Sequence, residues 1–279
     1  MRNSEANIAV IGCGYWGKNL VRNFAQLGAL SLVCDVTEAG RQNAKKLVSD
    51  IPVLSDPLQV WDTDIAGVVI ATPAETHYEV VRQALEANKD VLVEKPIAAT
   101  VEDAQALSDC AEALGRRLMV GHIVRFSPVI RALKEHLAAG ELGKIFQMVC
   151  RRVGPFPSRV QDVGVVVDLA PHDLDVMRFI SGAEPIRVYA ETQQKIHTDY
   201  EDLLAALLSF DNGMTGMLEI NWLTPQKVRE VAVLGEQGMF RVDDLTQDLF
   251  FYENAEANGL TWSHLSIIKG VSEGRMVRY

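Results

Sequence analysis

A glycine-rich loop near the start of the chain constrains the fold more than any other feature of the sequence. The motif Gly12-Cys13-Gly14-Tyr15-Trp16-Gly17 directly follows a short apolar run, 8–11, and precedes a helical pattern over residues 19–27. A carboxylate, Asp35, follows the next apolar run, 30–34. A strand, a glycine turn, a helix and a distal acidic residue in this order are typical of a dinucleotide-binding βαβ unit. A structural turn with incidental glycines is the alternative interpretation.

Each part of this loop has a physical task in binding a dinucleotide. Gly12 permits the tight turn, Gly14 removes a side chain where the backbone approaches the pyrophosphate, and Gly17 lets the helix pack on the strand. The helix N-terminus offers unpaired N–H groups to the phosphates. Asp35 accepts hydrogen bonds from both ribose hydroxyls and repels a 2′-phosphate, so we predict NAD rather than NADP. Arg41, six residues farther along and on the following helical pattern, is the candidate cation for a 2′-phosphate.

From residue 7 to about 121 the chain alternates between short apolar runs and amphipathic stretches. The apolar runs predict buried strands at 8–11, 30–34, 67–71, 90–93 and 117–120. The amphipathic stretches predict helices at 19–27, 39–48, 77–87 and 101–114. Such alternation is typical of a doubly wound parallel sheet with helices on both faces. We predict that residues 1–121 form an NAD-binding Rossmann domain.

The pattern changes after Ser127-Pro128. Helices are predicted over 128–139 and 171–181, and strands at 143–152, 186–193, 203–210, 214–222, 228–234 and 238–242. Asp211-Asn212-Gly213 and Glu236-Gln237-Gly238 are hairpin signals. We predict that residues 122–279 form an α+β domain with a mostly antiparallel sheet, for substrate binding and oligomerisation. Because a sheet with one face uncovered by helices usually finds a partner sheet, we expect a homodimer or homotetramer.

Composition narrows the possible partners. The formal net charge is −10, from 27 basic and 37 acidic residues, which argues against a nucleic acid or an anionic membrane as partner. No apolar run approaches the ~18 residues of a membrane span, and no secretory signal is recognised. The four cysteines include no Cys-x-x-Cys pair, so we expect buried thiols in a reducing compartment, without disulfides or a metal site. These features predict a cytoplasmic protein that acts on a small molecule.

Two further strand ends carry residues that suggest chemistry, because ligands of a doubly wound sheet bind at the carboxyl ends of its strands. One predicted strand leads into Thr72, Pro73 and, at the start of the next helix, His77. Another ends in Glu94-Lys95-Pro96. A lysine directly after a buried strand is uncommon as surface decoration, because its stem must leave a packed layer. A solvated loop lysine paired with Glu94 is the alternative.

A third group lies in the second half of the chain, in Asp168-Leu169-Ala170-Pro171-His172. Pro171 suits the first turn of a helix, which places His172 near a helix N-terminus. The helix dipole disfavours the imidazolium there, so the ring stays neutral and able to take a proton. Asp168, just outside the helix, orients the ring. A histidine that only caps or packs the helix is the alternative.

Together, the glycine motif, Glu94-Lys95-Pro96 and the pair Asp168 and His172 resemble the Gfo/Idh/MocA oxidoreductases, the family of glucose–fructose oxidoreductase and inositol dehydrogenase. The resemblance covers essentially the whole chain. It implies that Lys95 and His172 lie beside the nicotinamide and the reacting carbinol, with Asp168 next to them. The expected cofactor-binding residues are Gly12, Gly14, Tyr15, Trp16, Gly17, Asp35, Thr72, Pro73, His77, Glu94, Lys95 and His122.

Three segments, 14–20, 162–170 and 222–229, resemble the nucleotide-sugar branch of this family. That branch includes enzymes similar to UDP-N-acetylglucosamine 3-dehydrogenase. The resemblance implies NAD-dependent oxidation of a ring hydroxyl of a nucleotide sugar, UDP-N-acetylglucosamine or a related UDP-sugar, at carbon 3. Relatives usually continue past a segment like 274–279 into another helix, whereas this chain stops at Tyr279, which implies a fragment or a C-terminally truncated protein.

The expected reaction transfers a hydride from the carbinol carbon to nicotinamide while a base takes the hydroxyl proton. We assign His172 as that base, oriented by Asp168, and Lys95 as the donor that stabilises developing negative charge. The opposite assignment, with Lys95 as the base and His172 as the donor, is the alternative, because nearby positive charge and burial lower the pKa of a lysine. Arg125 and Arg159 are the predicted diphosphate ligands and complete, with Lys95 and His172, the expected substrate-binding set.

Other interpretations remain open at this point. Arg151 and Arg152 are adjacent on a predicted strand, so at most one of them can face a pocket. A free-sugar or inositol-type dehydrogenase would need no arginine pair at all. A non-catalytic NAD-binding regulatory or scaffolding protein would keep the fold, but the presence of Lys95, Asp168 and His172 argues against it.

Overall fold

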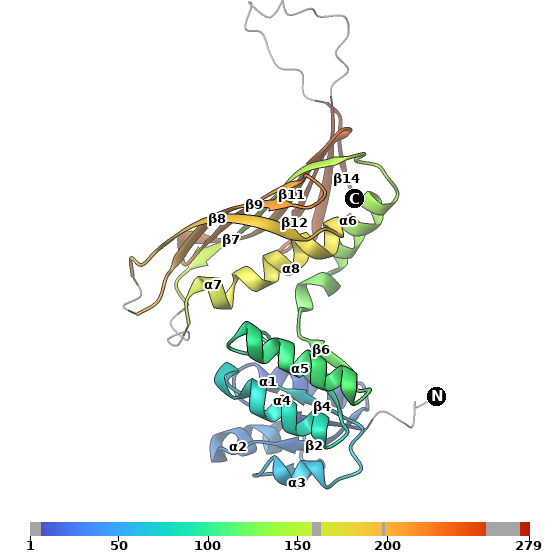
Figure 1. The fold of residues 1–279 in the computed structure, drawn as a ribbon, viewed down its shortest axis with the longest axis vertical. Helices are drawn as coiled ribbons and strands as arrows, with labels where there is room; N and C mark the ends of the chain where they lie inside the picture. The colour runs from blue at the N-terminus through green and yellow to red at the C-terminus, as the bar shows by residue number, and fades with distance from the viewer. Residues whose placement is uncertain (1–6, 158–162, 197–198, 255–273) are drawn as a thin grey trace, which may run out of the picture. The chain divides into compact units, whose positions relative to one another are not determined.

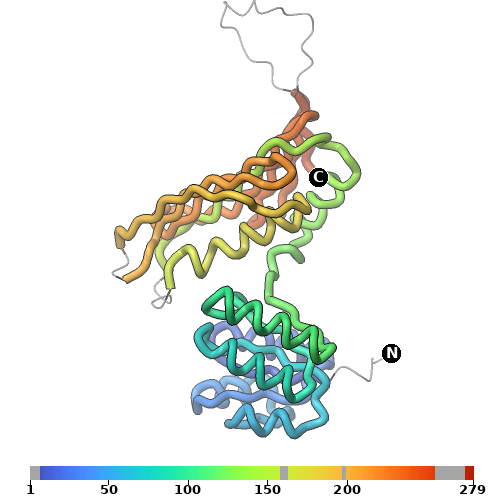
Figure 2. Tube along the Cα trace, in the orientation of Figure 1, coloured from blue at the N-terminus to red at the C-terminus, as the bar shows by residue number. Residues whose placement is uncertain are grey.

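The computed structural model describes residues 7–157, 163–196, 199–254 and 274–279. The chain forms two compact units, Met1–His122 and Ile123–Tyr279, shown as ribbons in Figure 1 and as a Cα trace in Figure 2. Among the helices of these described segments, none is both long and apolar enough to cross a membrane.

The first unit contains a six-stranded sheet in the order β3-β2-β1-β4-β5-β6. Its strands are β1 Ile8–Ile11, β2 Leu30–Cys34, β3 Val53–Leu54, β4 Gly67–Ile70, β5 Asp90–Val93 and β6 Leu118–Val120. Its helices are α1 Gly17–Gln26, α2 Glu38–Leu47, α3 Leu58–Trp61, α4 His77–Glu86 and α5 Val101–Ala113. Every strand pair in this sheet is parallel.

Alternate residues of β1 are buried in two separate cores. Ile11 packs in a cluster with Leu85 of α4 and Leu107 of α5, whereas Val10 belongs to a cluster with Val21 of α1. Both faces of the sheet are therefore covered by helices. This is the physical reason that the strand is a continuous apolar run rather than an alternating one.

The strand order reverses at β1, which has β2 on one side and β4 on the other. In an open parallel sheet, the crevice at the carboxyl ends of two such strands is where ligands bind. Ile11 and Ile70 are paired at these ends. The glycine loop that follows β1 and the Thr72 loop that follows β4 therefore start next to each other.

The second unit contains an eight-stranded sheet in the order β14-β13-β12-β11-β7-β10-β9-β8. Its strands are β7 Ile145–Pro155, β8 Pro185–Gln193, β9 Leu203–Phe210, β10 Thr215–Asn221, β11 Leu223–Gly235, β12 Gly238–Asp243, β13 Asp248–Glu253 and β14 Met276–Arg278. Its helices are α6 Pro128–Ala138, α7 Val165–Asp168 and α8 Ala170–Ser181. Only the β7–β10 pair is parallel among the described strand pairs of this sheet.

Helices α6 and α8 lie along one face of this sheet (Figure 1). Leu133 of α6 and Met177 of α8 are buried in one core with inward residues of the strands, such as Met148 of β7 and Leu218 of β10. Strand residues of opposite parity are more exposed, as the alternation along β10 shows. The sheet therefore has one helix-covered face and one open face.

The predicted fold class, a parallel Rossmann sheet followed by a mostly antiparallel sheet, is confirmed. The sequence patterns do not predict β3, β13 and β14 or the short helices α3 and α7. β3 has two residues and α3 and α7 have four each, which is too short for a periodic signal. β11 begins at Leu223 rather than at the predicted 228. Its register with β7 is irregular between Leu223 and Val228, so this part of the strand lacks a regular alternation.

Candidate functional site

The glycine loop forms a cradle of backbone at the carboxyl end of β1. Gly12 has a φ of 94°, and a Cβ there would lie 2.5 Å from the carbonyl oxygen of Ala71. A Cβ at Gly17 would overlap the carbonyl oxygen of Gly12. At Gly14, in contrast, no atom lies within 4 Å of the Cβ position. Two glycines are thus required by the protein's own packing, and the third leaves open space where a pyrophosphate approaches the backbone.

The N-terminus of α1 presents no anion of its own to the loop. Its N-cap residue, Trp16, makes no side-chain capping hydrogen bond, and its first turn holds no acidic residue. By comparison, α2 is capped by Thr37 and carries Glu38 in its first turn. A positive helix end that lacks an internal anion fits the phosphates of a dinucleotide.

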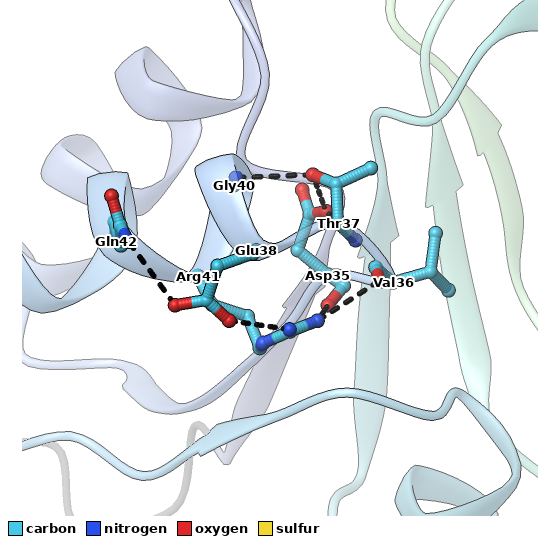
Figure 3. Close-up of polar contacts among 7 residues, drawn as sticks. All are labelled: Asp35, Val36, Thr37, Glu38, Gly40, Arg41 and Gln42. Carbon is cyan, nitrogen blue, oxygen red and sulfur yellow. Dashed lines mark hydrogen bonds and ion pairs between the residues drawn. The ribbon is translucent and has the colours of Figure 1, made fainter.

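Asp35 follows β2 and is 8% exposed. Its carboxylate accepts hydrogen bonds from the Cys13 backbone N–H (2.7 Å) and from the Thr37 backbone N–H (2.8 Å) and hydroxyl (2.6 Å). Figure 3 shows the two Thr37 groups around it. A carboxylate has about four acceptor sites, so about one of them is left for a ribose hydroxyl. The sequence predicts two ribose contacts; the structure adds a second task, the fixing of the glycine loop.

A glycine of α2 lies directly against this carboxylate. A Cβ at Gly40 would overlap the carboxyl group of Asp35. The Gly40 N–H also donates to the Thr37 hydroxyl at 3.0 Å. Asp35, Thr37 and Gly40 therefore form one packed corner between β2 and α2 (Figure 3).

The loop after β5 is joined to the glycine loop. The indole Nε1 of Trp16 donates to Glu94 Oε1 at 2.5 Å. A Cβ at Gly121 would lie 3.0 Å from Glu94 Oε2, so the end of β6 also packs against this carboxylate. Glu94 thus orders the segment that carries Lys95, and it has Trp16 as a partner. Lys95 itself is half-buried.

His77 connects the loops that follow β4 and β5. The residue is 1% exposed, and its ring nitrogens lie 2.6 Å from the carbonyl oxygen of Pro96 and 3.0 Å from that of Thr72. The sequence predicts that His77 contacts the cofactor. In the structure both ring nitrogens face backbone carbonyl oxygens, one of them in the residue next to Lys95. The cofactor contact stays a prediction, and we expect the ring also to position Lys95.

Replacing His77 with alanine is expected to destabilise the first unit by about 1–3 kcal/mol, because a loop carbonyl loses the N–H donor of this buried ring. The same variant is expected to lower turnover, since Lys95 is then held less firmly. Thermal unfolding and steady-state kinetics measure the two effects. His77→Gln keeps an N–H donor and should recover part of both. Unchanged turnover in a destabilised His77→Ala protein would contradict the positioning role.

The residues expected to perform acid–base chemistry lie in the second unit. Asp168 is the last residue of α7 and His172 lies in the first turn of α8, with Pro171 before it. Both side chains are half-buried. The predicted placement of His172 near a helix N-terminus is therefore confirmed.

The residue after His172 belongs to a buried ion pair that the sequence does not predict. Asp173 is 2% exposed and Arg152 of β7 is 8% exposed. The guanidinium donates to both carboxylate oxygens, at 2.7 and 2.9 Å. Arg151, next along β7, points to the other face and pairs with Glu219 at 2.6 Å. The expectation that these two arginines face opposite sides holds, and the inward one is already engaged by Asp173.

Arg229 of β11 is a further cation near this pair. Its position is directly opposite Arg152 in the β7–β11 pairing, and its guanidinium donates to the carbonyl oxygens of Val153 and Val228. Burial, and then the charge of Arg152, lower the pKa of Arg229 to about 10 against the opposing effects of Asp173, Asp244 and Asp168. A lone arginine in a strand gives no signal of this kind in the sequence. Only the pairing of β7 with β11 shows that Arg229 lies opposite Arg152.

The two arginines predicted to hold a diphosphate are placed differently. Arg125 forms a two-point ion pair with Asp175 of α8, and its guanidinium lies 5.0 Å from the ring centre of Phe179. The structure therefore gives Arg125 a partner within its own unit. Arg159 lies outside the described residues.

Comparison with known proteins matches the two units separately. A family model described as the oxidoreductase family with an NAD-binding Rossmann fold (GFO_IDH_MocA) matches residues 6–122. A second, described as the GFO/IDH/MocA C-terminal domain, matches residues 130–241. The matched segments contain the glycine loop, Asp35 and Lys95 in the first case, and Asp168 and His172 in the second.

Three proteins illustrate the similarity. UDP-N-acetylglucosamine 3-dehydrogenase of Acidithiobacillus ferrooxidans is 29% identical in sequence, over 87% of this chain and 75% of its own. Its solved structure matches with a TM-score of 0.80 and 28% identity, over 88% of this chain and 79% of that chain. Myo-inositol dehydrogenase Hyg17 of Streptomyces leeuwenhoekii is 30% identical over 83% and 74%. The WlbA dehydrogenase of Bordetella pertussis, solved with NADH and UDP-GlcNAcA, has a TM-score of 0.78, at 25% identity over 85% and 79%.

The family models cover both units, the glycine cradle fits a dinucleotide, and the relatives are named dehydrogenases. The chain is an NAD-dependent oxidoreductase that acts on CH–OH groups, and it belongs to the Gfo/Idh/MocA family.

Proposed function

We propose that this enzyme oxidises carbon 3 of a nucleotide sugar, UDP-N-acetylglucosamine or a related UDP-sugar, to the keto sugar. The observation that carries the proposal is the similarity over most of both chains to a UDP-N-acetylglucosamine 3-dehydrogenase. The resemblance of 14–20, 162–170 and 222–229 to the nucleotide-sugar branch supports it. The WlbA structure adds a neighbour that was crystallised with a UDP-sugar.

In this proposal the first unit binds the cofactor and the second binds the sugar. The glycine loop and Asp35 would hold NAD, which would supply the acceptor for the hydride of the carbinol carbon. His172 takes the hydroxyl proton, and Asp168 orients its ring. Lys95 donates a hydrogen bond to the same oxygen and stabilises the negative charge that develops there. His77 and Glu94 hold the segment that carries Lys95.

The second candidate is an inositol-type dehydrogenase. Its support is the similarity to Hyg17 and the engagement of Arg125 by Asp175, which leaves this arginine less available to a diphosphate. An uncharged cyclitol needs the same base and hydrogen-bond donor but no cation. The two candidates therefore differ in whether the enzyme needs a cation to bind a diphosphate, and they share the residues that act on the reacting hydroxyl.

A ligand screen with NAD present separates the candidates. We expect UDP-N-acetylglucosamine or a related UDP-sugar to raise the melting temperature and then to yield NADH absorbance, with myo- and scyllo-inositol inactive. NADH production from an inositol alone would replace the proposal with the second candidate. No turnover with any nucleotide sugar or cyclitol in the panel would contradict both.

We also propose that the open face of the second unit joins copies of the chain. One cross-strand row on this face runs through Tyr189, Leu207 and Met217, which are 65%, 46% and 38% exposed. An apolar row on a sheet face without helices suits a second sheet. Light scattering is expected to show a dimer or tetramer, and Leu207→Glu to shift it towards the monomer. A monomeric parent protein would contradict the proposal.

A further inference from the structure

An arginine lies beside the corner formed by Asp35, Thr37 and Gly40, and its guanidinium is already paired with other groups of the protein. Arg41 of α2 donates from Nη1 to the carbonyl oxygens of Asp35 (3.0 Å) and Val36 (2.9 Å). From Nη2 it forms an ion pair with Glu38 Oε2 at 2.6 Å. Figure 3 shows the guanidinium between the Asp35–Val36 backbone and the Glu38 carboxylate.

Glu38 is itself held in this arrangement. Its second oxygen accepts from Gln42 Nε2 at 3.2 Å. The hydrogen bonds from Arg41 and then from Gln42 lower the pKa of Glu38, so the carboxylate remains charged. Its side chain is 64% exposed and that of Arg41 is 22% exposed. The carboxylate therefore lies on the solvent side of the pair.

The position of Arg41 matters for the choice between two cofactors. NADP differs from NAD by a phosphate on the ribose 2′-oxygen, and Rossmann proteins that use NADP accommodate it with a nearby arginine. A guanidinium suits this role because its fork of N–H groups matches phosphate oxygens. Here the fork points along the Asp35 backbone, and a carboxylate neutralises it.

We propose that Glu38 is a specificity-determining residue, which keeps this enzyme on NAD by holding Arg41 away from a 2′-phosphate. Asp35 acts on the ribose directly, whereas Glu38 acts through Arg41. Removal of the Glu38 charge should free the guanidinium to turn towards an added phosphate. The inference concerns the adenosine half of the cofactor site and does not depend on the identity of the sugar.

The test is the binding of two nucleotides that differ only at the 2′ position. Calorimetry compares adenosine 5′-monophosphate with adenosine 2′,5′-bisphosphate on the full chain. Glu38→Gln is expected to tighten binding of the bisphosphate about tenfold, the size of one hydrogen bond to a charged group, and to leave the monophosphate within about twofold. The ratio of NADP to NAD in kcat/KM should rise in parallel.

The chain offers a matched control. Glu79, Arg82 and Gln83 of α4 repeat the spacing of Glu38, Arg41 and Gln42, with an ion pair of 2.7 Å and a Gln83 bond of 2.7 Å. Glu79→Gln removes the same charge at the same sequence spacing on another helix, where Arg82 also pairs with Glu86 at 2.6 Å. It should leave the affinity for both nucleotides unchanged. Both glutamates are exposed enough that folding should be unaffected, which a melting curve checks.

A double variant tests whether Arg41 mediates the effect. In Glu38→Gln/Arg41→Gln the gain for the bisphosphate should disappear. Equal gains in Glu38→Gln and Glu79→Gln would show a general charge effect and overturn the proposal. A gain that survives in the double variant would overturn it as well, because Glu38 would then act without Arg41. Unchanged affinity of Glu38→Gln for the bisphosphate would also overturn the proposal.

Discussion

Replacing His172 with alanine is expected to lower turnover by about 10²–10⁴-fold, the usual contribution of a general base, while NAD still binds. His172 lies in the second unit and the glycine cradle in the first, so the substitution touches no predicted phosphate or ribose contact. Stopped-flow measurement of NADH formation under saturating substrate gives the rate. Calorimetry with NAD shows whether the first unit still binds its cofactor.

The roles of His172 and Lys95 are separated by a parallel variant. Lys95→Met removes the hydrogen-bond donor and keeps a side chain of similar length. If His172 is the base, added imidazole is expected to restore part of the turnover of His172→Ala and none of that of Lys95→Met. Rescue of Lys95→Met by a small amine, with His172→Ala insensitive to imidazole, would exchange the two assignments. Near-normal turnover of His172→Ala would contradict both.

Replacing Asp173 with alanine is expected to cost about 3–5 kcal/mol of the free energy of unfolding of the second unit, because it leaves Arg152 buried without its partner. Arg229, opposite Arg152 across β7 and β11, adds like-charge repulsion. Urea unfolding, monitored by hydrogen exchange of the β7 and β11 amides, measures the loss of unfolding free energy.

The neighbouring strand position provides the control for this prediction. Arg151 pairs with Glu219 on the open face, where their side chains are 40% and 49% exposed. Glu219→Ala should cost under about 1 kcal/mol, as exposed ion pairs do. Similar losses for Asp173→Ala and Glu219→Ala would contradict the assigned difference in burial. Replacing Arg152 and Asp173 together with apolar residues should recover much of the loss.

Local patterns predict most of the fold. Most of the first unit can be predicted because consecutive residues indicate its strands, turns and helices, as in the apolar run of β1 and the glycines that follow it. The length of β9, Leu203–Phe210, is likewise set by one apolar segment and its turn. β13 and β14 lack this kind of signal, because β14 has three residues and depends on pairing with β13.

Contacts between distant residues decide what the sequence does not predict. Asp173 lies 21 residues from Arg152, and only the packing of α8 on β7 brings them together. His77 carries no sign of its two carbonyl partners, because the loops that supply them meet only when β4 and β5 pair. The same holds for Asp35, whose bond to Cys13 crosses from β2 to the loop after β1.

The overlap between position 40 and the Asp35 carboxylate makes the effect of one substitution depend on the other. In the present background Gly40→Ala drives a methyl group into a charged, engaged side chain, and both the helix and the hydrogen bonds of Asp35 are disturbed. Once Asp35 is replaced by a smaller residue, the same methyl group gains room and alanine favours the helix. The order of mutations therefore matters: a lineage or an engineer that changes position 35 first can then stabilise α2, whereas the reverse order passes through a damaged protein.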